Sequence, residues 1–593
     1  MKRTSIAEVT KLLVKTALGV EKADSVIRGG TLVNVNSCEL LENVDVAIKK
    51  DRVAMVGKCD HTFGNNTTII DARGKYIVPG FLDGHVHFES SMLTLTRFAS
   101  AIIPHGTTTI FIDPHEIANV LGLDGVRLVV KESERLPLKV FVCVPSCVPA
   151  APSFETSGAE FAVKDVATAL EWEGVIGLGE VMNYSGVLNC DNKMHGEIKA
   201  ALRIGKTVEG HANTLLDKEL AAYVASGISS CHESASAIDG IQRLRLGMYA
   251  MIREASAWRD LSDVIKCVTE RGLDSRHACL VTDDRHCEDL LKEGHMDYVV
   301  RRAIEEGVDP VIALQMASLN TAEHFGVSRE IGSIAPSKYA DILILDDLTK
   351  VKVNTVIADG KVVARNGKLL IDIQPPSYPP EIKKTVRLAS PASPENFVVK
   401  PPSPRKKVSV HVIGVVEGKA NTRHLKRFLP VENGEVKPSV ENDIVKVAVV
   451  ERHKRTGNIC VGFVEGFGLK SGAVASSVAH DSHNIIVIGI GGTYMTLAVN
   501  ALAKVGGGIA AVQDRKTIAL VELPIAGLMS AEPPRQVCRK FMELQKAWRK
   551  LGCTIKSPFM SLSMLALPVI PELRITDCGL VDVKESKLIQ LFA

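Results

Sequence analysis

Two histidines two positions apart are the first residues of the chain that could do metal chemistry. His85 and His87 end an apolar run, FLDGHVH. Side chains alternate between the two faces of a strand, so residues two apart share one face, about 6–7 Å from each other. Two imidazoles at that spacing can hold one metal ion. The motif alone is weak, because a single strand histidine is more often a hydrogen-bonded core residue than a ligand.

Carboxylates and imidazoles also end several later apolar runs: Glu180, His211, His232, Asp283 and Asp284. Taken singly, Glu180 could form an ion pair at a rim, and the two aspartates could cap a helix. Taken together, an H-x-H pair, a glutamate, two histidines and an aspartate follow one another at successive predicted strand ends. We interpret this order as one metal site.

The number of candidate ligands indicates how many ions the site holds. Four histidines and two carboxylates exceed the three protein ligands of a mononuclear catalytic zinc ion. They suit two divalent ions about 3.5–4 Å apart, with Glu180 as the bridging carboxylate. Imidazole and carboxylate ligands fit Fe²⁺, Mn²⁺ or Zn²⁺. Metal-bound water loses a proton near neutral pH and becomes a nucleophile, and Asp283 is placed to accept that proton.

The runs that carry these residues predict the scaffold. Eight apolar runs lie at 81–87, 107–113, 139–147, 175–180, 206–211, 227–233, 248–254 and 277–284. Stretches with helical periodicity, such as DKELAAYVAS, separate them. This alternation predicts an α/β fold, with a (β/α)8 TIM-type barrel over residues 81–330. The active site of such a barrel lies at the C-terminal ends of its strands.

The remaining segments predict further units around the barrel. Residues 26–80 and 331–372 share short alternating strands and Gly or Asn turns, which predict two parts of one small β-sandwich. Residues 1–25 have apolar positions at helical spacing and predict an N-terminal helical segment. Residues 373–407 are rich in Pro and Ser and read as a linker, and 408–593 predict a C-terminal α/β domain.

Composition argues against several classes of protein. Seventy-one basic and sixty-eight acidic residues leave a net charge of +3, too balanced for a nucleic-acid binder. Thirteen cysteines show no paired short spacing, which favours a reduced, cytoplasmic setting over a disulfide framework. The apolar stretch 485–503 contains three glycines and predicts a strand, a turn and a helix, so no membrane segment is expected. Its glycines lack the G-x-G-x-x-G spacing of a dinucleotide site.

Longer motifs resemble the adenine deaminase family of the amidohydrolase superfamily. They are PGFLDGHVHFESSM, IDPHEIANVLG, PSCVPA, GLGEVMNYSGV, SCHES, MIREASAWRDL and LVTDDRH in the barrel region, then ADILILDDL, SVAHDSHNIIVIG and ELPIAGLMS. The resemblance implies hydrolysis of adenine to hypoxanthine and ammonia at two metal ions, usually iron or manganese, in purine salvage. It also implies a homo-oligomer. Because no basic cluster at the strand ends suits a phosphate, a free purine base is the expected substrate.

The resemblance also implies roles for individual residues. The implied metal ligands are His85, His87, His211, His232 and Asp283, with Glu180 as the bridge that many amidohydrolases replace by a carbamylated lysine. Asp284 and Arg253 are expected to bind the substrate.

His115 and Glu116, in the loop after the second run, are expected to face the substrate, with Glu116 as a catalytic group beside Asp283. The alternative for these two is a helix N-terminus with a favourable carboxylate. His480, Asp481 and His483 lie in the matching C-terminal block. A further metal contact, a domain-interface network and a loop over the active site are all open for them.

Two stretches depart from the family pattern. ANTLLDKEL follows His211, and Glu254-Ala255-Ser256 stands where Glu-Gly-Ser is usual. Neither departure removes a ligand, but both lie near the expected rim and bear on substrate preference. Two other functions stay open at this point. One is a metal-dependent hydrolase of cyclic or N-acyl amides with the same ligands, and the other is an inactive protein on the same barrel, which the complete ligand set disfavours.

Overall fold

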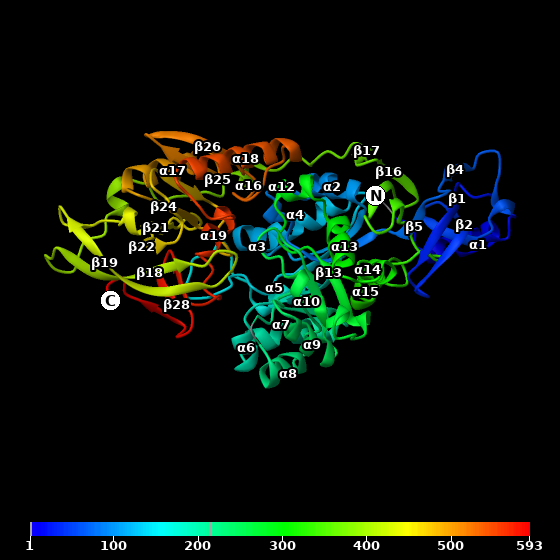
Figure 1. Cartoon of the computed structure of the whole chain (residues 1–593), viewed down its shortest axis with the longest axis horizontal. Helices are drawn as coiled ribbons and strands as arrows, with labels where there is room; N and C mark the ends of the chain where they lie inside the picture. The colour runs from blue at the N-terminus through cyan, green and yellow to red at the C-terminus, as the bar shows by residue number, and fades with distance from the viewer. Residues whose placement is uncertain (1–2, 214) are drawn as a thin grey trace.

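The computed structural model describes residues 3–213 and 215–593. Figure 1 shows the N-terminal strands in blue at one end of the long axis, the barrel region in the middle, and the C-terminal region from yellow to red at the other end. The candidate site is positioned by the middle and C-terminal parts.

Eight parallel strands coincide with the eight predicted runs and fit a TIM-type barrel. They are β6 (Phe81–Val86), β7 (Thr107–Ile112), β8 (Lys139–Val144), β9 (Val175–Val181), β10 (Thr207–Gly210), β11 (Ser230–Cys231), β12 (Tyr249–Arg253) and β13 (Ala278–Val281). The order β10-β9-β8-β7-β6 forms one sheet and β11-β12-β13 another. A parallel bridge from Val86 to Asp283 joins β6 to the end of β13. At the other junction, the Ser229 N–H donates to the Val208 carbonyl at 2.9 Å.

The barrel interior is filled with apolar side chains. Strand β7 is buried along its whole length, as expected of a parallel strand covered on both faces. A core cluster joins side chains from several strands: Leu82, Phe111, Cys143, Met251, Cys279 and Val281. Such filling makes the barrel a solid platform that fixes the residues at its strand ends.

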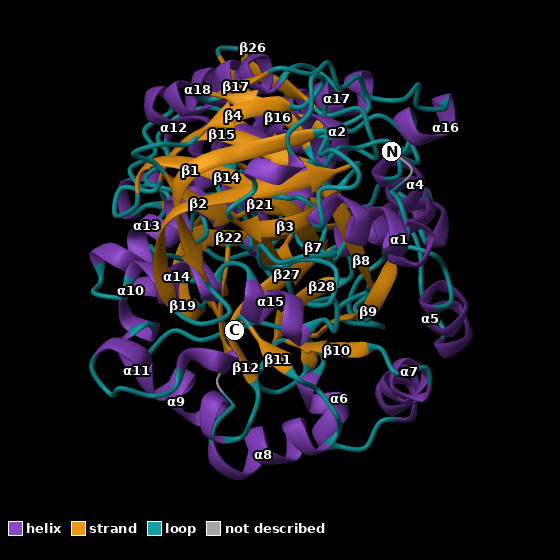
Figure 2. Cartoon of the chain, turned by 90° about the vertical axis from the view of Figure 1, so that its right-hand side faces the viewer, coloured by secondary structure: helices purple, strands orange, loops and turns teal. Residues whose placement is uncertain are grey.

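Helices surround these strands, as Figure 2 shows for the helices at the periphery of the molecule. In the barrel region they are α2 (Leu95–Ile102), α3 (His115–Leu121), α4 (Leu123–Ser133), α5 (Val163–Leu170), α6 (Tyr184–Leu188), α7 (Asn192–Arg203), α8 (Asp217–Ala225), α9 (Ala237–Arg245), α10 (Leu261–Val264), α11 (Lys266–Thr269), α12 (Cys287–Lys292), α13 (Met296–Glu305), α14 (Pro310–Met316) and α15 (Leu319–His324). Helix α14 illustrates the local signals, since Asp309 caps it and Pro310 opens its first turn.

The segments before and after the barrel share one nine-stranded sheet. Its strands are β1 (Ser25–Asn34), β2 (Glu39–Lys49), β3 (Arg52–Gly57), β4 (Thr68–Asp71), β5 (Tyr76–Pro79), β14 (Ile342–Asp347), β15 (Lys352–Ala358), β16 (Lys361–Arg365) and β17 (Lys368–Leu369). Strand β5 pairs antiparallel with β14, so the two flanks meet by backbone hydrogen bonds. Helix α1 (Ile6–Ala17) packs Val9 and Leu13 against Ala54 of β3.

The C-terminal region contains a second nine-stranded sheet. Its strands are β18 (Lys407–Val415), β19 (Thr422–Glu432), β20 (Glu435–Val436), β21 (Ile444–Val450), β22 (Ile459–Glu465), β23 (Ala473–Ser476), β24 (Ile485–Gly489), β25 (Gly508–Gln513) and β26 (Lys516–Glu522). A small sheet of β27 (Leu573–Thr576), β28 (Gly579–Asp582) and β29 (Lys587–Ile589) follows. The helices are α16 (Pro380–Lys383), α17 (Gly492–Val505), α18 (Pro534–Lys550) and α19 (Pro558–Met564).

The apolar stretch 485–503 is strand β24, a glycine turn and most of helix α17, as predicted. Met495, Val499 and Leu502 of the helix pack against the sheet in one core cluster. None of the helices in the described part of the chain combines the length and hydropathy that a bilayer crossing requires.

Hydrogen bonds to backbone carbonyls join the C-terminal region to the barrel. The Thr94 N–H donates to the Ser530 carbonyl at 3.1 Å, and the Arg97 side chain donates to the Ala531 carbonyl at 2.8 Å. Elsewhere, the Asn484 amide donates to the Thr156 carbonyl at 2.7 Å. The last of these contacts directly follows residues 480–483 and holds the end of that loop against the barrel.

Candidate metal centre and active site

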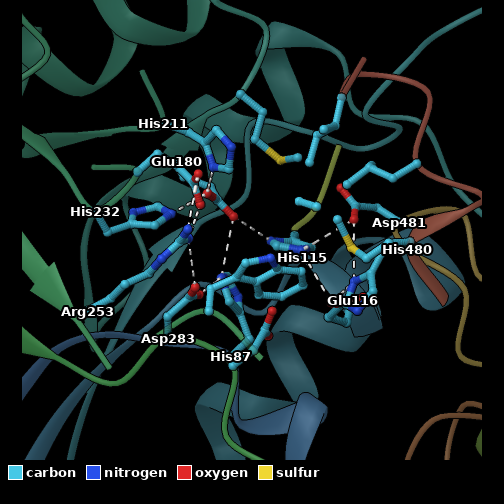
Figure 3. A pocket seen from close by; sticks show the side chains of 18 residues that line it. His87, His115, Glu116, Glu180, His211, His232, Arg253, Asp283, His480 and Asp481 are labelled. Atoms are coloured by element: carbon cyan, nitrogen blue, oxygen red, sulfur yellow. Dashed lines mark hydrogen bonds and ion pairs between the residues drawn. The ribbon is translucent and has the colours of Figure 1, made fainter. Parts of the chain in front are cut away.

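A cavity with about 490 Å³ of empty space lies at the C-terminal ends of the barrel strands. Figure 3 shows imidazoles and carboxylates converging on it. Nine predicted site residues line it: His87, His115, Glu116, Glu180, His211, His232, Arg253, Asp283 and Asp284. The tenth, His85, stacks on His232 with ring centroids 3.8 Å apart. The structure therefore brings all the predicted site residues together.

The carboxylate of Glu180 lies between two groups of imidazoles. Its Oε1 is 3.4 Å from His87 Nε2, whereas its Oε2 is 2.5 Å from His211 Nδ1 and 3.0 Å from His232 Nε2. Asp113 accepts the Glu180 N–H at 2.8 Å and so fixes the end of strand β9. With one oxygen directed to each group, Glu180 has the placement of a bridging ligand.

Asp283 faces the H-x-H pair. Its Oδ1 is 3.4 Å from His87 Nε2 and 3.7 Å from His85 Nε2. His87 Nδ1 lies 3.0 Å from the Asp113 carbonyl, which makes Nδ1 the protonated nitrogen and leaves Nε2 free for a metal. Asp283 has a φ of 58°, and its N–H donates to the His85 carbonyl at 3.0 Å. That hydrogen bond holds the aspartate backbone in the left-handed region, which residues other than glycine rarely adopt.

The donor atoms fit a divalent metal site. Three overlapping groups have ligand atoms within 4.8 Å of one another: His85, His87 and Glu180; His85, His232 and Asp283; Glu180, His211 and His232. All are buried, and His85 Nε2 has no hydrogen-bond partner among the described residues. An unpaired buried nitrogen is unfavourable unless something binds it. Imidazole nitrogens and carboxylate oxygens together are a donor set that divalent ions accept.

Burial and neighbouring charges shift the pKa values of these groups. Burial, reinforced by Asp284, raises the pKa of Asp283 to about 6, although Arg253 opposes the shift. Burial also acts to raise the pKa of Glu180, but His211 and His232 outweigh it and hold that pKa well below its usual range. Burial together with His232 lowers the pKa of His85, which keeps this imidazole neutral and able to bind a metal.

Arg253 is held by carboxylates around it. Its Nε donates to Asp260 at 2.9 Å, and its Nη1 donates to Asp283 at 3.2 Å and contacts Glu233. Burial acts to raise the pKa of Glu233, but Arg253, His211 and His232 together outweigh it and the pKa falls to about 2. Sequence reasoning missed Glu233, although its position directly after His232 at a strand end was the available signal.

The other predicted residues sit on the cavity wall. Ser90, which the sequence reasoning did not single out, donates its hydroxyl to Asp284 at 2.5 Å. His115 lies at the start of α3, with Nδ1 3.4 Å from Glu180 Oε1 and Nε2 3.5 Å from Glu116 Oε1. Glu116 therefore lies one imidazole away from the bridging carboxylate.

Side chains of the C-terminal region complete the site. His480 Nδ1 is 2.7 Å from Glu116 Oε1, and His483 Nε2 contacts Glu116 Oε2. Burial raises the pKa of Glu116, yet His480 and His483 outweigh burial and lower it well below its usual range. The apolar part of the wall includes Met182, Trp258, Met564, Leu567 and Ile570. No local sequence signal identified the last three, because they lie about 280 residues or more beyond the barrel ligands in the chain.

Comparisons with known proteins cover both parts of the chain. The model of the amidohydrolase family matches residues 76–363, and that of the adenine deaminase C-terminal domain matches residues 419–587. Among solved structures, an adenosine deaminase from Xanthomonas campestris with bound zinc aligns with a TM-score of 0.45 at 15% identity, over 59% of this chain and 95% of that one.

Curated relatives match over the full length. A protein named adenine deaminase from Moorella thermoacetica is 52% identical, over 99% of each chain. One of the same name from Mesorhizobium japonicum is 50% identical, over 99% of this chain and 97% of its own. Another from Clostridium botulinum is 45% identical, over 99% of this chain and 98% of its own. Because relatives of this name are 45–52% identical over 99% of this chain, the chain belongs to the adenine deaminase family of the amidohydrolases.

Proposed function

We propose that this protein is an adenine deaminase, which hydrolyses adenine to hypoxanthine and ammonia in purine salvage. The observation that carries the proposal is the cavity, which is lined by Glu180 and its imidazoles together with apolar side chains such as Trp258 and Leu567. A neutral purine has a polar ring edge and apolar faces, and it suits such a cavity. The full-length relatives named adenine deaminase select adenine among the bases that would fit.

Six residues would hold two divalent ions: His85, His87, His211, His232, Asp283 and the bridging Glu180. We assign Mn²⁺ or Fe²⁺ to the site, with Zn²⁺ also compatible with the donor set. When bound, two such ions lower the pKa of water and supply a nucleophile near neutral pH.

Asp283 is the proposed proton carrier. Its buried carboxylate lines the cavity and is placed to accept a proton from water and to return it to the leaving amine. Arg253 donates to Asp283 Oδ2 at 3.2 Å and so orients the carboxylate. Deamination needs this transfer, because the exocyclic amine leaves as ammonia.

The remaining predicted residues are proposed to bind the base. Asp284, oriented by the Ser90 hydroxyl, would accept a hydrogen bond from the purine ring. His115 and Glu116 face the same cavity, and Glu116 is proposed as the second catalytic group. Arg253 borders the cavity. It would contact the substrate only through guanidinium N–H groups that its carboxylate partners leave free.

The fuller architecture is also part of the proposal. We assign residues 81–330 to a (β/α)8 barrel, 26–80 and 331–372 to one β-sandwich, and 408–593 to the C-terminal α/β domain. Residues 1–25 would be an N-terminal helical segment and 373–407 a linker. The antiparallel pairing of strand β5 with strand β14 supports one unit formed by both flanks of the barrel. On the family resemblance we also propose a cytoplasmic homo-oligomer.

The test is ammonia release from adenine by the purified protein, loaded with Mn²⁺ and, in a separate sample without oxygen, with Fe²⁺. Cytosine, guanine, adenosine and a cyclic amide serve as competing substrates. Metal-dependent turnover of adenine alone is the expected result. Turnover of the cyclic amide without turnover of adenine would instead assign another amidohydrolase reaction.

A further inference from the structure

A second cluster of imidazoles and carboxylates lies beside the six proposed ligands. His115 and Glu116 open helix α3, whereas His480 and Asp481 lie in the loop between β23 and β24. One ligand atom from each of the four lies within 4.8 Å of the others. Figure 3 shows these side chains converging on the side of the cavity away from His211 and His232. The cluster thus joins the barrel to the C-terminal region.

The polar atoms of this cluster are buried, and some of them have no partner among the described residues. None of the four side chains is in a residue more than 5% exposed. His480 Nε2 and Asp481 Oδ2 have no hydrogen-bond partner in the described part of the chain. The Glu116 oxygens contact the imidazoles of His480 and His483. Buried carboxylates and imidazoles gathered in this way are unfavourable unless protons or a bound cation balance their charge.

The distances within the cluster suit ligands around one ion. Glu116 Oε1 is 2.7 Å from His480 Nδ1 and 3.5 Å from His115 Nε2. Asp481 Oδ1 is 3.6 Å from His480 Nδ1 and 3.9 Å from His115 Nε2. Ligand atoms that each lie about 2.0–2.2 Å from a tetrahedral metal ion are separated by roughly 3–3.5 Å. Two of the four distances are a few tenths of an ångström longer and the Glu116–His480 distance is shorter, so ion binding would require small side-chain rotations.

The charges of the cluster also match a divalent cation. Two carboxylates and two neutral imidazoles carry a charge of −2 when no proton is bound, and a divalent ion neutralises it. Imidazole nitrogens and carboxylate oxygens are donors that Zn²⁺, Mn²⁺ and Fe²⁺ accept. His483 contacts the other oxygen of the Glu116 carboxylate, Oε2, and so orients that carboxylate. Such an orienting partner is usual for a carboxylate that binds a metal.

We propose that His115, Glu116, His480 and Asp481 form a third divalent-cation site between the barrel and the C-terminal region. This site goes beyond the proposed adenine hydrolysis, which requires only the two ions around Glu180. Its ion would bind Glu116 and fix the position of that carboxylate on the cavity wall. It would also tie the loop after β23 to helix α3, and so couple the C-terminal region to the active site.

The test counts and locates the ions in the full-length protein. The protein is stripped with a chelator, titrated with Mn²⁺ alone, and analysed by elemental analysis and by anomalous diffraction at the manganese edge. About three ions per chain are expected, against about two in Asp481→Asn and in His480→Gln. His286→Gln is the matched control and should retain about three, because His286 is also a buried imidazole at this interface, packed against Phe541 and Phe559.

Two ions in the unchanged protein, with no anomalous peak between Glu116 and Asp481, would overturn the third site. The anomalous map of the unchanged protein decides the matter even where a variant fails to fold. This outcome is distinct from failure of the proposed function: a protein with two ions that deaminates adenine lacks only the third site, and one with three ions that leaves adenine untouched lacks only the proposed activity.

Discussion

At the scale of single residues, we propose that Asp283 combines the roles of ligand and proton carrier. One carboxylate oxygen faces the Nε2 atoms of His85 and His87, and the other accepts from Arg253. Burial beside Asp284 raises its pKa to about 6. The backbone of Asp283 is held in place by its hydrogen bond to the His85 carbonyl.

The substitution Asp283→Asn tests this combination. The amide has nearly the same shape but cannot carry the proton, so we expect kcat for adenine to fall about 10²–10⁴-fold in the Mn²⁺-loaded protein. Ammonia release measures the loss, and a circular dichroism melting curve controls for folding. Turnover within about twofold of the unchanged protein would contradict the assignment of Asp283 to proton transfer.

At the scale of elements, helix α7 shows how a barrel helix buries an acid. Asp191 caps the helix by accepting from the Lys193 and Met194 N–H groups at 2.9 and 3.0 Å. The buried face then carries Met194 and Ile198, together with Glu197. Both carboxylate oxygens of Glu197 have no hydrogen-bond partner among the described residues. Burial raises the pKa of Glu197 to about 8, although Lys193 partly opposes the shift.

This acid predicts a pH-dependent stability. The pKa of Glu197 is about 8 in the folded state and about 4.3 in the unfolded chain, so the folded state retains a proton that the unfolded chain releases. The stabilisation is complete below about pH 4 and is lost as the pH rises through 8. Glu197→Gln cannot ionise, and we expect it to raise the free energy of unfolding at pH 9 by about 1–3 kcal/mol, with a smaller gain near pH 5.5.

Denaturant unfolding at the two pH values measures this effect. Glu219→Gln on α8 provides the control, because Glu219 is an exposed glutamate on a neighbouring helix. An equal effect of Glu197→Gln at both pH values would show that the buried carboxylate does not titrate between them.

At the scale of the whole molecule, the active site is shared by two regions of the chain. The barrel contributes the proposed metal ligands, while Leu567 and Ile570 of the C-terminal region form part of the apolar cavity wall. The two regions also share one continuous apolar core. Substrate binding should therefore depend on side chains far from the ligands in the sequence.

Leu567→Ala tests that dependence. Loss of a buried leucine side chain from the wall removes up to about 1.5–3 kcal/mol of apolar contact, so the KM for adenine should rise about tenfold or more while kcat changes less. Leu497→Ala is the control, since Leu497 lies on α17 of the same region and is 36% exposed. Steady-state ammonia release gives both parameters. A fall in kcat at constant KM would place Leu567 outside the substrate wall.

Metal removal should destabilise the molecule as well as inactivate it. Ions that bind only the folded state stabilise it by about 2.7 kcal/mol at a free concentration one hundred times Kd. We expect a chelator to lower the Tm by several degrees and added Mn²⁺ to restore it. Differential scanning calorimetry provides the measurement. An unchanged Tm would mean that the buried imidazoles and carboxylates hold no structural ion.

Much of the barrel and of its ligand set was predictable because the signals are local. Each ligand lies at or directly after the end of an apolar run, and a strand end fixes where its side chain points. Thus His85, His87, Glu180 and His211 could be assigned before any contact was known. Arg253 lines the cavity, so its predicted contact with the substrate stays a prediction, but the three carboxylates that surround it were not predicted. Glu233 and Asp260 set that outcome, and their approach depends on loop conformation.

The sequence by itself determined the order of strands, the residue types at their ends and, through long motifs, the family. Only the tertiary structure decided that His480, Asp481 and His483 meet Glu116, and that Met564 and Leu567 close the cavity. The reason is physical. Periodicity and turn residues report the conformation of a few neighbouring residues, whereas contacts across 350 residues of chain arise from the packing of one region against another, which no local pattern encodes.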